Sequence, residues 1–96
     1  MFINVKKLNS KAKLPERATA TSAGADLCAC IDDDVVLMPG DRKLIPTGLA
    51  IAVPTGYGGF VFARSGLSSK FGVSLANCVG VIDSDYTGEI RVGLVN

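Results

Sequence analysis

The brevity of its apolar runs is the feature that most constrains how this chain can fold. Each run covers a few residues and is interrupted, about every eight to twelve residues, by Gly, Pro or Asp, a rhythm typical of short antiparallel strands. Helical periodicity is almost absent. The pattern therefore predicts an all-β fold, either a small antiparallel β-barrel or a sandwich.

The positions of the elements follow from the same pattern. We expect strands at residues 3–5, 25–31, 35–37, 44–45, 49–53, 59–63, 73–76, 79–82 and 89–95. Residues 9–22 fit neither period and predict a loop. Pro39 and Gly40 stand in the order that a type II turn prefers, so the chain should reverse there. The run RSGLSSKFG predicts the one short helical turn, which we expect to start at Leu67.

The length of the chain limits its organisation. Ninety-six residues lie at the low end of the usual domain size, so residues 1–96 predict a single domain. Hydrophobic residues make up 48% and charged residues 20% of the chain, as in proteins that fold. A domain this small buries a limited fraction of its surface, and association with copies of itself would add stability.

Charge and cysteine content narrow the partners and the compartment. The net charge of +1 is too balanced for a protein that binds duplex nucleic acid, so we expect a small ligand. We find no run that predicts a signal peptide or a membrane span, and we expect no membrane partner. Three cysteines, an odd number, with no histidine, favour a reducing compartment over a mixed zinc site. We therefore expect a soluble intracellular protein, in the cytoplasm above other compartments.

The absence of histidine also excludes a Ser-His-Asp hydrolase, and no Walker phosphate loop is present. What remains is carboxylates, backbone amides, and Arg64 beside Ser65 and Gly66. A guanidinium can bind phosphate oxygens in a bidentate manner, and a glycine lets the backbone approach a ligand. The alternative is an ordinary serine helix cap beside an exposed arginine.

The run NCVGVIDSDYTGEI is a second candidate for chemistry. Asp83, Asp85 and Glu89 gather acidic groups around a turn, where a carboxylate can orient and deprotonate a water. Asn77 offers both a donor and an acceptor, which suits the edge of a pyrimidine. The alternative is a β-hairpin with a polar tip, and the residues alone leave both interpretations open.

Three segments together resemble a known family. AGADL at residues 23–27, ARSGLSSKFGV at residues 63–73 and NCVGVIDSDYTGEI at residues 77–90 are similar to the first three of the five motifs of the trimeric dUTP diphosphatase (dUTPase) family. They stand in the family's order and cover essentially the whole chain. The resemblance implies a distorted jelly roll or small β-barrel and hydrolysis of dUTP to dUMP and pyrophosphate.

The resemblance also implies roles for the third motif. Asp83 would be the general base that orients the water attacking the α-phosphorus, and Tyr86 would pack against the deoxyribose. The uracil edge would be bound by one side chain and three backbone segments, those of Asn77, Gly80, Val81 and Ile82.

The remaining roles concern the phosphates and the metal. The resemblance implies that Arg64, Ser65 and Gly66 contact the phosphates, and that Asp26 holds a hydrated Mg²⁺ ion through water. Arg91 falls where family members also approach the nucleotide.

The family's fourth motif and its glycine-rich fifth motif, a C-terminal arm, have no counterpart in residues 1–96. In the family three chains build each active site, so the resemblance implies a homotrimer, here with impaired turnover. Two alternatives stay open. One is a dCTP deaminase-like enzyme, which is disfavoured because VIDSDY offers aspartates where that chemistry uses a glutamate. The other is a non-catalytic module that binds deoxynucleotides.

Overall fold

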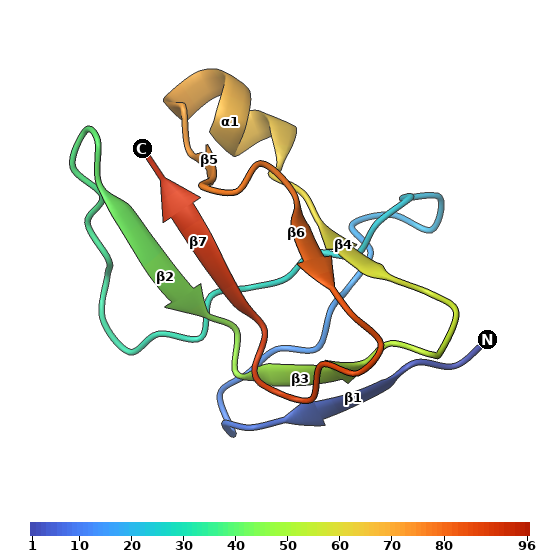
Figure 1. Cartoon of the computed structure of the whole chain (residues 1–96). Coiled ribbons are helices and arrows are strands. Elements are labelled where there is room, and N and C mark those ends of the chain that lie inside the picture. Colours follow the sequence, from blue (N-terminus) through green and yellow to red (C-terminus); the bar gives the residue numbers. More distant parts are fainter.

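The computed structural model describes every residue from Met1 to Asn96 and consists of short strands, long loops and one helix (Figure 1). The strands are β1 (Asn4–Lys7), β2 (Arg42–Pro46), β3 (Leu49–Ala52), β4 (Gly59–Val61), β5 (Ser74–Leu75), β6 (Gly80–Ile82) and β7 (Arg91–Val95). The helix is α1 (Ser65–Phe71). The predicted all-β class with one short helix is confirmed, and the helix begins at Ser65 rather than at Leu67.

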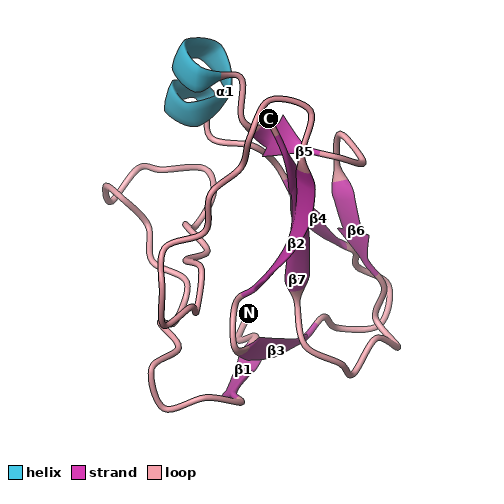
Figure 2. Cartoon of the chain, turned by 90° about the vertical axis from the view of Figure 1, so that its left-hand side faces the viewer, coloured by secondary structure: helices cyan, strands magenta, loops and turns pink.

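All strand pairs are antiparallel, and they form three small sheets. The largest has the order β2-β7-β5, while β1 pairs with β3 and β4 pairs with β6. The helix lies at one end of the strands, and β1 and β3 lie across the other end (Figure 2). The three sheets do not close into a barrel within this chain.

The strands expected at residues 25–31 and 35–37 are absent, and this prediction is wrong. Between β1 and β2 the only strand-like pairing is one bridge, between Glu16 and Asp26. Cys30 is attached by a single backbone bond, its N–H donating to the carbonyl of Pro46 at 2.8 Å. Apolar content alone made these segments look like strands, but no neighbouring strand offers them a ladder of hydrogen bonds.

The predicted reversal at Pro39 and Gly40 is confirmed. Gly40 has φ of 85°, the left-handed value that a type II turn requires at its third position. The N–H of Asp41 donates to the carbonyl of Met38 at 2.9 Å and closes the turn. This turn leads into β2.

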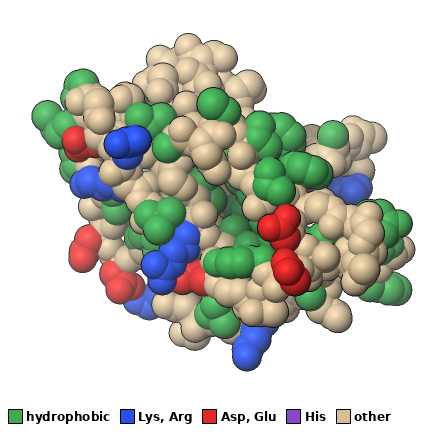
Figure 3. All heavy atoms as spheres, in the orientation of Figure 1, with side chains coloured by type: hydrophobic (Ala, Val, Ile, Leu, Met, Phe, Trp, Pro, Cys, Tyr) green, Lys and Arg blue, Asp and Glu red, His purple; other side chains and the backbone are tan.

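The core of the fold is small. Only nine of the 96 residues are buried, and the main cluster consists of Val53, Ile82 and Ile90. Apolar side chains spread across much of the face in Figure 3, among relatively few charged ones. The structure contains no helix with the length and apolar character that crossing a bilayer requires.

The link between β2 and β3 crosses the segment that leads into β7, and this crossing joins two of the sheets. Thr47, Gly48 and Leu49 are all buried there. The Thr47 hydroxyl donates to the carbonyl of Ile90 at 2.6 Å, and the N–H of Ile90 donates to the carbonyl of Leu49 at 2.8 Å. The same hydroxyl oxygen accepts the N–H of Leu49 at 3.3 Å. Thr47 therefore fixes both strands of the crossing.

We predict that Thr47→Val lowers the free energy of unfolding by about 1–3 kcal/mol, because the buried N–H of Leu49 loses its acceptor. Thr47→Ser is the matched control, since it keeps the hydroxyl and should cost less. Urea unfolding followed by circular dichroism measures both variants. A Thr47→Val variant as stable as the wild type would show that the hydroxyl does not hold the crossing.

Candidate functional site

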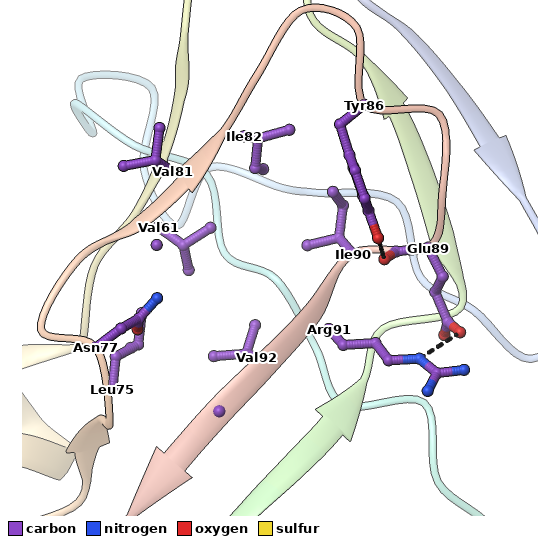
Figure 4. A pocket seen from close by; sticks show the side chains of 12 residues that line it. Val61, Leu75, Asn77, Val81, Ile82, Tyr86, Glu89, Ile90, Arg91 and Val92 are labelled. Carbon is purple, nitrogen blue, oxygen red and sulfur yellow. Dashed lines mark hydrogen bonds and ion pairs between the residues drawn. The ribbon is translucent and has the colours of Figure 1, made fainter.

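A cavity of about 160 Å³ lies between β6 and β7, beneath the segment that joins them (Figure 4). Six of the predicted site residues line it, namely Asn77, Gly80, Val81, Ile82, Tyr86 and Arg91. They come from the β5–β6 turn, from β6, from the β6–β7 segment and from β7. The structure therefore brings five residues of the third motif together with Arg91, which follows that motif and stands fourteen positions after Asn77.

One edge of β6 is unpaired on the side of the cavity. The strand pairs only with β4, in the register Gly80 with Val61, Val81 with Phe60 and Ile82 with Gly59. Its other edge therefore has no strand partner, and backbone N–H and C=O groups there are available to a planar ligand.

Asp83 follows β6 directly, and although its neighbour Ile82 lines this cavity, Asp83 itself does not. The residue before it, Ile82, is buried in the core and fixes the start of the turn. The carbonyl of Asp83 accepts the N–H of Tyr86 at 3.1 Å, while its carboxylate is exposed and makes no hydrogen bond within the chain. That carboxylate is free to bind a water.

The ring of Tyr86 folds back along the segment that carries it (Figure 4). Its hydroxyl donates to the carbonyl of Glu89 at 2.7 Å. A Cβ at Gly88 would lie 2.7 Å from the Tyr86 hydroxyl oxygen and 2.9 Å from the ring. Gly88 is therefore the residue that leaves room for this ring position.

Glu89 also lines the cavity, and the sequence prediction gave it no role of its own. Its Oε2 accepts the N–H of Gly48 at 2.9 Å, and its Oε1 accepts Nε of Arg91 at 3.1 Å. The pairing with Arg91 was open to prediction, because alternate residues of a strand share one face. The hydrogen bond between Glu89 and Gly48 could not be predicted from the sequence, since 41 positions separate the two residues.

Asn77 lies in the tight turn between β5 and β6, next to a strained residue. Cys78 has φ of 67° and is the only residue other than glycine with a positive φ. Its N–H donates to the carbonyl of Leu75 at 3.1 Å, and the N–H of Val79 donates to the carbonyl of Asn77 at 2.7 Å. These bonds hold Cys78 in the left-handed region and set the direction in which Asn77 leaves the turn.

The residues predicted to contact phosphates lie elsewhere, around the start of α1. Arg64 is the N-cap residue and makes an ion pair with Asp26, with 3.3 Å between Nη1 and Oδ2. The helix has no side-chain cap, so the alternative of a serine cap is wrong. Ser65 and Gly66 form the first turn and are exposed, which leaves their amides open to a ligand.

Within one chain these two groups of residues do not meet in one cavity. Arg64 lines a second, larger and mainly apolar cavity of about 410 Å³. The cavity between β6 and β7 has only three lining residues in common with it, Val61, Leu75 and Val92. Each half of the predicted site is present, but the halves are separate.

Asp26 is the one residue that was predicted to bind metal. Its carboxylate is partly exposed and pairs with Arg64. No group of three or more histidine, cysteine, aspartate or glutamate side chains is close enough to hold a bare ion. Such a lone carboxylate suits a hydrated Mg²⁺ carried mainly by phosphates and water.

Comparison with known proteins gives one consistent result. A family model described as dUTPase matches residues 10–96. A deoxyuridine 5′-triphosphate nucleotidohydrolase of Desulfitobacterium hafniense is 59% identical over 85 residues, which cover 88% of this chain and 56% of that protein. The protein of the same name from Syntrophotalea carbinolica is 50% identical over 94 residues, covering 98% of this chain and 64% of that one.

Comparison with solved structures also finds dUTPases. A mutant dUTPase from phage phi11 of S. aureus, described with a structural Mg(II) ion, superposes with a TM-score of 0.90 at 34% identity. The match covers 100% of this chain and 60% of the phage protein. The present chain thus spans less than two thirds of the length of each of these relatives.

We predict that Cys78→Gly raises the free energy of unfolding by about 0.5–1 kcal/mol. Glycine removes the cost of a left-handed conformation, about 1–2 kcal/mol, and adds a smaller entropic cost of its own. Cys78→Ala keeps the Cβ and should bring no gain, so it is the control. Urea unfolding of the three chains measures the difference, and equal gains from Ala and Gly would show that the backbone angle is not the cause.

Proposed function

This chain belongs to the dUTPase family, and on that premise we propose that it hydrolyses dUTP to dUMP and pyrophosphate in nucleotide metabolism. The observation that carries the proposal is the cavity between β6 and β7, where six of the predicted nucleotide contacts meet. The alternative of a dCTP deaminase is not favoured, because the relatives are named as dUTP nucleotidohydrolases.

Uracil would be recognised by Asn77 and the free edge of β6. The unpaired backbone groups of β6 suit the alternating donor and acceptor edge of a pyrimidine. A cavity of about 160 Å³ lined by Val61, Leu75 and Ile82 offers apolar contacts to such a ring. We propose that a methyl group at C5 of the base would clash, which would exclude thymine nucleotides.

The sugar and the attacking water would be handled by the β6–β7 segment. Tyr86, fixed by its bond to Glu89, would lie against the deoxyribose and leave no room for a 2′-hydroxyl. The exposed Asp83, directly after Ile82 of the cavity lining, would accept a proton from the water as it attacks the α-phosphorus. Arg91 would approach the nucleotide from β7.

The phosphates would be held by Arg64, Ser65 and Gly66 of a neighbouring copy. We base this on the separation of the two halves within one chain. Phe60 lines the larger cavity and its cross-strand partner Val81 lines the smaller one, and both are about 60% exposed, so apolar surface beside the two halves is available for association. We therefore propose a homotrimer with shared active sites.

Magnesium fits the donor set proposed for the phosphate half. Asp26 offers one partly exposed carboxylate beside the phosphate-binding arginine, and would hold the hydrated ion through water. When bound, Mg²⁺ neutralises negative charge on the triphosphate. The three free cysteines suit a reducing compartment, so we propose that the protein acts inside the cell.

We predict that Asp83→Asn lowers pyrophosphate release from dUTP by about 10²–10⁴-fold, the range expected for loss of a general base. Asp85→Asn removes a neighbouring carboxylate of equal charge and should keep most of the rate. A coupled pyrophosphate assay with Mg²⁺ measures both. Equal rates for the wild type and Asp83→Asn would refute the assignment of the base.

Calorimetric titration with a non-hydrolysable dUTP analogue complements this assay. Binding without any pyrophosphate release by the wild type would identify the chain as a non-catalytic deoxynucleotide-binding module. Binding with release supports the hydrolase.

A further inference from the structure

We infer that Glu89 is a positioning residue that holds Tyr86 and Arg91 in place, and that it thereby sets the discrimination between deoxyribonucleotides and ribonucleotides. The inference rests on the proposed function and adds a residue to it. Glu89 itself need not contact the nucleotide.

The Glu89 carboxylate uses both of its oxygens on different parts of the chain. Oε2 accepts the backbone N–H of Gly48 and Oε1 accepts Nε of Arg91. The Glu89 side chain is 20% exposed, against 57% for that of Arg91. The carboxylate is thus an internal link, and solvent competes with it less than with an exposed ion pair.

Gly48, the anchor of this link, cannot easily move. It is buried with φ of 68°, and a Cβ there would lie 2.9 Å from Cβ of Ala12 and 3.0 Å from Sγ of Cys30. Its carbonyl accepts the N–H of Leu8 at 2.7 Å. The N–H that Glu89 binds is therefore held by packing and by hydrogen bonding.

The backbone of Glu89 connects this fixed position to Tyr86. The carbonyl of Glu89 accepts the Tyr86 hydroxyl, and the N–H of the same peptide unit, that of Ile90, donates to Leu49. The N–H of this peptide is held by Leu49, and the Glu89 side chain adds a second link, to Gly48, while Thr47 holds the next peptide through the Ile90 carbonyl. Loss of the carboxylate removes the link at residue 89 itself, so the carbonyl that accepts the Tyr86 hydroxyl, and with it the ring, gains freedom.

The same carboxylate orients Arg91. Because Nε is bound to Oε1, the two terminal nitrogens of the guanidinium point away from Glu89 (Figure 4). Those nitrogens stay available to an acceptor on the nucleotide. A glutamine at position 89 would still accept the Gly48 N–H through its amide oxygen but would attract Arg91 less strongly.

The test compares dUMP and UMP binding by calorimetry for the full chain and its variants. A packed wall rejects an added hydroxyl by about 100-fold, so freeing Tyr86 should lower the preference for dUMP about tenfold. We expect this loss in Glu89→Ala and most of the preference to remain in Glu89→Gln. A preference that is unchanged in Glu89→Ala would overturn the inference.

A double-mutant cycle shows whether Glu89 acts through Tyr86. Tyr86→Phe removes only the hydroxyl that Glu89 accepts. If Glu89 acts through that ring, the double variant should lose no more preference than either single variant, about tenfold rather than about 100-fold. Additive losses would contradict positioning through Tyr86.

Nuclear magnetic resonance of the free protein separates this inference from the proposed function. In Glu89→Ala the Tyr86 ring signals should move toward unfolded-chain values, while cross-strand contacts between β2 and β7 persist. Unchanged Tyr86 signals would overturn the positioning role. A wild type that binds dUMP no better than UMP would instead refute the proposed function, and the Tyr86 signals would still decide where the ring is held.

Discussion

The crossing of residues 47–49 with Glu89 and Ile90 is the contact on which the rest of the structure depends. Thr47 and Leu49 bind Ile90 from both sides, and Gly48 binds the Glu89 carboxylate. These bonds join the end of β2, the start of β3 and the start of β7 in one buried place. In a domain with only nine buried residues, a hydrogen-bonded crossing supplies the order that a large core would otherwise give. The segment between β6 and β7 begins after the buried Ile82 and ends at the buried Ile90. Because both ends are fixed in the core, its polar residues keep a defined position.

In the proposed function the β6–β7 segment supplies one half of a nucleotide site, and the start of α1 supplies the other. The first half contains a free strand edge, an amide side chain, an aromatic ring and, directly after β6, an exposed carboxylate. The second contains Arg64, open amides and Asp26. The two halves line different cavities, which share only Val61, Leu75 and Val92, and this separation is the basis for proposing that copies of the chain associate. The proposed association of copies would account for the separation and would cover the exposed side chains of Phe60 and Val81.

Much of the fold and part of the candidate site could be predicted from the sequence. The rhythm of apolar runs gave the all-β class, and the order of Pro39 and Gly40 gave the turn before β2. The third motif contains five of the predicted site residues that line the β6–β7 cavity, although its Asp83 is not in that lining. The strand prediction for residues 25–31 was wrong because apolar content does not reveal whether a partner strand is available. The Glu89 bond to Gly48 and the positive φ of Cys78 depend on contacts and turns that no local pattern encodes.

The central claim is that the two halves meet only between copies of the chain, and mixing two inactive variants tests it most directly. Arg64→Ala lacks the phosphate half, and Asp83→Asn lacks the proposed base. Equimolar chains, unfolded together and refolded, should recover about a quarter of the wild-type rate of pyrophosphate release from dUTP, because random association restores about one intact site in four. A mixture no more active than either variant alone would contradict the account, since both halves would then have to come from a single chain.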